Sequence, residues 1–143
     1  MAQPDPDRRG VSILAIDAQL REILRSAAGG ASFDVVTAQL DDVASLPEAS
    51  RYRSAVLHTR LSLCWIFAGR PVTSEQAERT LREYLDVCAD VDARATAVMA
   101  TVREYPALAA LLDEFEPELA SAAESDAIVY VRAMWSRLRR DLE

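Results

Sequence analysis

Apolar residues recur at steps of three and four along most of this chain, which is the spacing of one face of an α-helix. The pattern is most regular after Thr73, which forms a capping-box signature with Gln76 and so marks a helix start. We predict one continuous helix over about residues 74–104, at the centre of the fold. Its heptad seam consists of Ala77, Leu81, Tyr84, Cys88, Val91, Ala95, Val98 and Val102.

Helices are also expected on either side of this segment. Residues 31–46 fit a short strand or a short helix, and we favour the helix. The pattern therefore predicts an all-α bundle of about five helices. Besides the central one, these cover about residues 12–28, ended by Gly29 and Gly30, then 47–68, 107–115, and a last helix that Pro117 opens.

The ends of the chain differ in what they can bury. Residues 1–10 are rich in proline, aspartate and arginine, so we predict a flexible lead-in. Residues 11–143 are expected to form a single helical-bundle domain, because half of the 143 residues are apolar and the length is that of one ordinary domain.

The heptad seams suggest how the protein is used. A helix of about 30 residues needs a long partner, which is another helix of the bundle or a second copy of the chain. We expect a protein partner, with self-association as a homodimer the first choice. The candidate interface residues are Leu81, Tyr84, Val91, Val98, Val102 and, on the last helix, Trp135.

The residue types that are missing exclude several classes of enzyme. All 16 basic residues are arginine, so a Walker A loop, a kinase ATP site and Schiff-base chemistry lack their lysine. A single histidine excludes an HExxH zinc site and a ferritin-like di-iron site. We expect no cofactor and no metal. Without a signal peptide or an apolar run long enough to cross a bilayer, a cytoplasmic location off the membrane is expected.

Charge is unevenly distributed. The net charge is −7, and all of the acidic excess lies after residue 71, which makes binding to nucleic acid unlikely in this reading. Seven acids and no basic residue lie between Glu104 and Asp126. We interpret this stretch as a solvated face, with a cation or a basic partner as the alternative. The arginines around Trp135 are expected to complement the end of the last helix, or else to meet the acidic stretch of a neighbouring chain.

Arg53 and His58 form an R-x4-H pair. This motif resembles that of the HEPN family of helical ribonucleases, in which arginine and histidine from two protomers meet around an RNA phosphate. The resemblance implies that Arg53 would clamp the phosphate and that His58 would move the proton of the 2′-hydroxyl, without a metal. Ser54 departs from the family, which has a polar amide or an acid after the arginine. Both residues are therefore candidate catalytic residues for an alternative function.

Two further resemblances concern the same histidine. A histidine phosphotransfer domain has a lysine three residues after its histidine, where this chain has Leu61. The segments SILAID, FDVVTA and AVLHTRL resemble the first three strands of a response-regulator receiver, with Asp17 near the acidic pair. The absence of lysine argues against a working receiver, and the helical period of residues 12–28 favours coincidence.

The sequence therefore favours a non-enzymatic helical module for protein–protein interaction or dimerisation. The first alternative is a metal-independent, HEPN-like ribonuclease that uses Arg53 and His58. The second is a small-ligand sensor, whose pocket would be lined by Trp65, Phe67, Tyr84 and Met99.

Overall fold

The structure is a computed structural model that describes the backbone from Asp7 to Glu143 and side chains from Ala15 onward. Over this range the chain is helical, with no β-strand, which confirms the all-α fold class. Seven α-helices and two short 3₁₀-helices are present in the described range, so the count of five was wrong. Residues 1–6 of the expected lead-in lie outside the described residues, and the first helix already begins at Asp7.

The chain divides into two compact units, the first ending at Ile66 and the second covering Phe67–Glu143. The single domain expected over residues 11–143 stays a prediction. In the first unit, α1 (Asp7–Ala28), α2 (Phe33–Ala44) and α3 (Arg53–Ile66) contact one another, and the 3₁₀-helix η1 (Pro47–Tyr52) leads into α3. Their buried core includes Ile16, Leu20 and Ile23 of α1, Val36 and Leu40 of α2, and Leu61 and Leu63 of α3.

Residues 33–44 are a helix, as favoured from the sequence, and local chemistry explains why. The backbone turns after α1 at Gly30, whose φ of 107° suits glycine. Ser32 then caps α2, because its hydroxyl accepts a hydrogen bond from the Val35 amide at 3.3 Å. All three segments that resemble receiver strands lie in helices, which bears out the view that this resemblance is coincidental.

The second unit is built around α5. It contains α4 (Ser74–Val87), α5 (Val91–Glu104), the 3₁₀-helix η2 (Pro106–Leu108), α6 (Ala110–Ala120) and α7 (Asp126–Leu142). Helix α5 contacts α4, α6 and α7, and α6 also contacts α7. The expected capping box opens α4, with the Gln76 amide donating to Thr73 Oγ1 at 3.3 Å and the Thr73 amide donating to Gln76 Oε1 at 2.9 Å.

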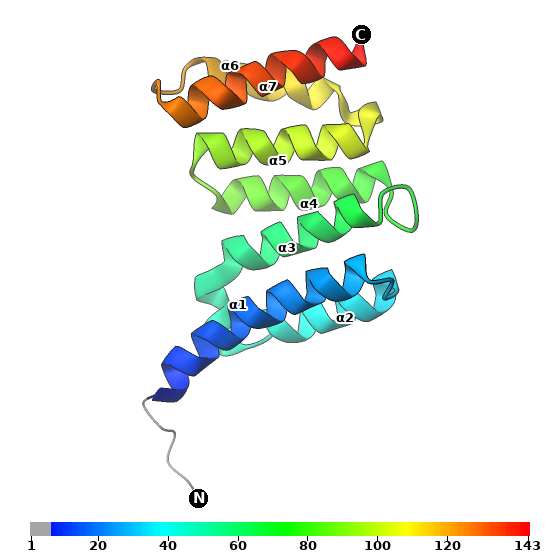
Figure 1. The fold of residues 1–143 in the computed structure, drawn as a ribbon, viewed down its shortest axis with the longest axis vertical. Coiled ribbons are helices and arrows are strands. Elements are labelled where there is room, and N and C mark those ends of the chain that lie inside the picture. Colours follow the sequence, from blue (N-terminus) through cyan, green and yellow to red (C-terminus); the bar gives the residue numbers. More distant parts are fainter. Residues whose placement is uncertain (1–6) are drawn as a thin grey trace, which may run out of the picture. The chain divides into compact units, whose positions relative to one another are not determined.

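The continuous helix over residues 74–104 was wrong. The chain leaves the helix at Cys88, which has extended backbone angles (φ −99°, ψ 120°), and re-enters it at Val91. Figure 1 shows α4 and α5 as the two arms of a hairpin that starts and ends on the same side of the unit. The heptad seam therefore folds back on itself and is not one long stripe.

The physical reason for the break is burial. A single straight helix would expose the seam of both halves, whereas the hairpin buries Ala77 and Leu81 of α4 with Val98 and Val102 of α5. Four of the five residues from Val87 to Val91, all except Ala89, have low helix propensity. Asp90 takes the N-cap position of α5, and Asp92 places a negative charge in its first turn.

Pro117 does not open the last helix, as the sequence suggested, but lies inside α6. The ring removes one amide donor from the helix and crowds the carbonyl of Asp113, and the helix ends three residues later, at Ala120. The last helix begins instead at Asp126, after Ser125, whose hydroxyl accepts a hydrogen bond from the Ile128 amide at 3.1 Å.

Burial of the folded-back seam leads to a stability prediction. Val98 is completely buried in α5, so Val98→Asp should lower the free energy of unfolding by more than about 3 kcal/mol, because an unpaired charge would enter the core. Thr96→Asp, at an exposed position of the same helix, is the matched control and should change it by about 0.5 kcal/mol or less. Urea denaturation measures both. Equal stabilities of the two variants would contradict the placement of Val98.

Candidate functional site

Arg53 and His58 both lie on α3, where Arg53 is the first residue of the helix and both side chains are exposed. Five residues along an α-helix correspond to a rotation of about 140° between them. The two side chains therefore leave the helix on different faces of one chain. The nuclease hypothesis stays a prediction that needs a second protomer to bring such residues together.

His58 makes an edge-on contact with Trp65, with ring centroids 5.8 Å apart and ring planes at 86°. Burial lowers the pKa of His58 from its ordinary 6.5, because neighbouring side chains displace water that would stabilise the imidazolium. His58 is also followed on the same stripe by Ser62, whose hydroxyl donates to the His58 carbonyl at 2.8 Å. This serine hydroxyl therefore donates to the helix backbone.

The candidate interface residues of the heptad seam are mostly inside the protein. Leu81, Tyr84, Val98, Val102 and Trp135 are buried in the single chain, and Val91 is half-buried. Burial also raises the pKa of Tyr84, so its phenol stays neutral. A second copy would have to open the unit to reach most of these side chains. An interface therefore requires other residues that are exposed in the folded chain.

The acidic stretch from Glu104 to Asp126 is largely paired within the second unit. Arg82 of α4 binds Glu114 of α6 through two parallel hydrogen bonds, in which Nη1 donates to Oε1 and Nη2 donates to Oε2, each 2.9 Å long. This guanidinium lowers the pKa of Glu114. Arg139 of α7 binds both Asp113 and Glu116 of α6, the latter at 2.8 Å. Arg139 of the basic last turns thus meets acids of this stretch inside one chain, whereas the sequence suggested such a contact only as an alternative and between neighbouring chains.

Arg94, in the first turn of α5, contacts both α4 and α6. Its Nε donates to Glu118 Oε1 at 2.7 Å, and its Nη2 donates to Glu118 Oε2 at 3.3 Å. Its Nη1 donates to the carbonyls of Leu85 and Cys88, the latter at 3.0 Å. One partly buried guanidinium therefore satisfies two carbonyls at the C-terminal end of α4 and forms an ion pair with α6.

Arg132 has the same role one hairpin later. From α7 its guanidinium donates to the carbonyls of Leu119, Ala120 and Ala122, at 3.0 to 3.3 Å, where α6 ends. Glu124 lies 3.8 Å from the same guanidinium. Arginines 94, 132 and 139 are therefore structural, which removes them from any set of residues available to a ligand.

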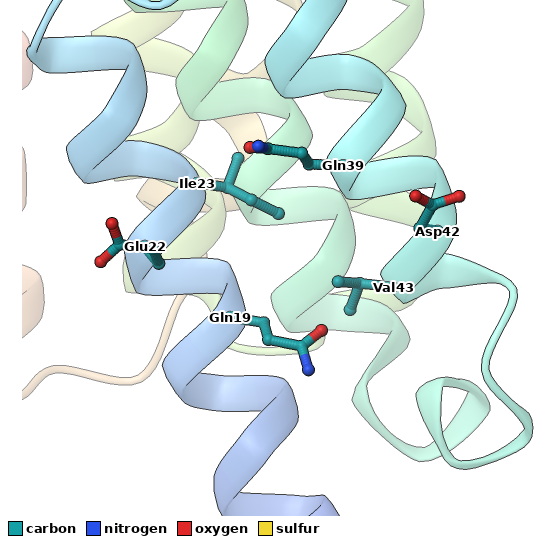
Figure 2. Close-up of a pocket in the computed structure, with 6 residues that line it drawn as sticks. All are labelled: Gln19, Glu22, Ile23, Gln39, Asp42 and Val43. Atoms are coloured by element: carbon teal, nitrogen blue, oxygen red, sulfur yellow. The ribbon is translucent and has the colours of Figure 1, made fainter.

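A hollow of about 260 Å³ lies between α1 and α2 in the first unit. Its floor is formed by Ile23 and Val43, and Figure 2 shows Gln19 and Gln39 extending across it while Glu22 and Asp42 point away. The aromatic residues expected to line a sensor pocket are not among its lining residues. The two amides therefore offer hydrogen bonds over an apolar floor.

Among the described residues, no group of three or more histidine, cysteine, aspartate or glutamate side chains is placed to hold a metal ion. None of the helices described is both long enough and apolar enough to cross a membrane.

The outward face of α7 is the feature that the sequence analysis missed. The buried stripe of this helix contains Ile128, Val131, Trp135 and Leu138. The opposite face exposes two large apolar side chains next to each other, Val129 at 51% and Tyr130 at 67% exposure. On the same face lie the exposed residues Asp126, Ala133, Ser136, Arg137 and Arg140. Neither Arg137 nor Arg140 forms an ion pair with any described residue, unlike Arg132 and Arg139.

Comparison of the chain with protein-family models, with curated proteins and with solved structures finds no match.

The contacts of Arg94 predict a large loss on mutation. Arg94→Met should lower the free energy of unfolding by about 2 to 3 kcal/mol, because it leaves Glu118 and two helix-end carbonyls without their donor. Arg25→Met is the matched control, since among the described residues Arg25 forms an ion pair only with the exposed Glu22 of the same helix. Its substitution should lower the free energy of unfolding by a small fraction of that amount. Urea denaturation measures both free energies. A cost for Arg94→Met no larger than that of the control would contradict the closing role of Arg94.

The lowered pKa of His58 predicts a pH dependence. Because the folded state binds the proton less readily than the unfolded chain, the free energy of unfolding should fall as the pH drops through 6.5, with no contribution from His58 at higher pH. His58→Phe should reduce this fall between about pH 7.5 and about pH 5, while the exposed Ser54→Ala keeps the wild-type slope. Denaturation series over this range measure the slopes. Identical slopes in wild type and His58→Phe would show that folding leaves the imidazole unperturbed.

Proposed function

We propose that this chain is a non-enzymatic helical module that binds a protein partner through the outward face of α7. The observation that carries the proposal is the exposure of Val129 and Tyr130 beside two arginines that have no ion-pair partner in the described chain. Large exposed apolar side chains that cluster mark interaction sites more often than scattered ones do.

The composition of this face favours protein over other partners. Tyrosine and arginine are the residue types that concentrate at protein interfaces, where they supply rigid area and directional hydrogen bonds. A phosphate backbone would meet only two arginines here, on a chain whose net charge is −7. The face carries both an acid, Asp126, and bases, so its ideal partner carries charges of both signs.

The rest of the unit supports α7 as a fixed platform. Its buried stripe is anchored on the core by Trp135, which is 2% exposed. It is tied to α6 by Arg132, near its middle, and by Arg139, in its last turn. A helix held on one side in this way presents its outward side chains in a fixed arrangement, which lowers the entropic cost of binding.

Site-specific photo-crosslinking tests the proposal without knowledge of the partner. A photoreactive phenylalanine analogue at position 130 should yield a covalent protein adduct in cells that express the chain, because Tyr130 projects into the expected interface. The same analogue at the exposed position 38 of α2 is the control and should yield none. Mass spectrometry of the adduct identifies the second chain. Absence of an adduct at 130, or equal adducts at both positions, would refute the role of α7.

A further inference from the structure

We infer that the α7 face binds the same face of a second copy of this chain, with the two α7 helices antiparallel across a two-fold axis at Ala133. The inference rests on the proposed function and names its partner. A two-fold interface must be self-complementary, because each residue meets a residue equally far from the axis on the other protomer. The order of side chains along α7 meets this requirement.

The centre line of the face supplies the first match. Asp126, Ala133 and Arg140 follow one another at seven-residue steps, so they lie nearly in line on the side of α7 opposite its buried stripe. Asp126 and Arg140 are each seven residues from Ala133. In the antiparallel pair Asp126 of one protomer therefore faces Arg140 of the other, and symmetry makes this ion pair twice.

The two flanks supply the other matches. Tyr130 precedes Ala133 by three residues, and Arg137 follows it by four on the same flank. They therefore meet at nearly the same height across the axis, where a guanidinium can lie over a phenol ring. On the other flank Val129 meets Ser136 in the same way.

The orientation and the closeness of the helices follow from the same residues. A parallel arrangement would place Asp126 against Asp126 and Arg140 against Arg140, so like charges exclude it. At the axis, the small Ala133 side chain lets the two helices approach closely. Contact through one helix per protomer gives an interface below the usual size, so the dimer should be weak and reversible.

The choice of a second copy over a different acidic protein depends on Asp126. An acidic partner would pair with Arg137 and Arg140 but would be repelled by the Asp126 carboxylate at the other end of the face. In the antiparallel dimer this carboxylate is matched. Neither of the two arginines needs to give up an ion pair with a described residue to take part.

Charge reversal tests the pairing by sedimentation equilibrium of the full chain. Asp126→Arg and Arg140→Asp should each raise the dimer dissociation constant at least about tenfold, since each turns two attractions into two repulsions. The double variant should return it to near the wild-type value. Glu75→Arg, in the first turn of α4, and Arg103→Asp, in the last turn of α5, repeat the same charge changes at other helix ends and should leave the constant unchanged.

The outcomes separate this inference from the proposed function. A wild-type chain that stays monomeric overturns the inference, while an adduct at position 130 with another protein would still uphold the proposed function. A dimer that is indifferent to both single reversals also overturns it. Circular dichroism checks that each variant folds. If the double variant does not fold, Ala133→Glu replaces it, because two carboxylates at the axis should give a folded monomer, and an unweakened dimer would refute the pairing.

Discussion

The second unit depends on arginine side chains that converge on α6. Arg82 of α4, Arg94 of α5 and Arg139 of α7 each form an ion pair with carboxylates of α6. The more exposed of these pairs contribute little stability individually. Their combined effect is geometric, because α6 has only three buried residues and ion pairs on two faces of the helix fix its rotation. The pairs join Arg82 to Glu114, Arg94 to Glu118, and Arg139 to Asp113 and Glu116.

Arginine side chains also bind the free carbonyl groups at two helix ends. Helices commonly close with a glycine or an asparagine in a left-handed conformation, but this chain has four glycines and no asparagine. Gly30 and Gly69, with φ of 107° and 83°, serve the turns after α1 and α3. The last carbonyls of α4 and α6 are bound instead by Arg94 and Arg132, each from the helix that follows. Arginine thus connects helix termination to hairpin packing.

Much of the fold was predictable because its signals are local. Helical periodicity, the capping box at Thr73 and the helical state of residues 33–44 all follow from neighbouring residues. The break at Cys88 was not, since a heptad pattern reads the same in one long helix and in a hairpin whose two seams face each other. What decides between them is the burial of both seams in the hairpin, together with the ion pair of Arg94 with Glu118, which is 24 residues away in sequence. The acids at Asp90 and Asp92 were the available signal, and they mark a helix start inside the predicted helix.

The outward face of α7 could not be predicted from the sequence for a related reason. Along α7 the seam of Ile128, Val131 and Trp135 is the conspicuous pattern, and it belongs to the core. The outward stripe of Asp126, Ala133 and Arg140 has the same seven-residue step but mixed chemistry, so hydropathy alone cannot separate it from an ordinary solvated face. The ion pairs separate the two, because they show which arginines the fold has already used. Once the heptad seam is buried and most of the acidic stretch is paired within one chain, the exposed residues left to recognise a partner are those that neither the core nor these ion pairs need.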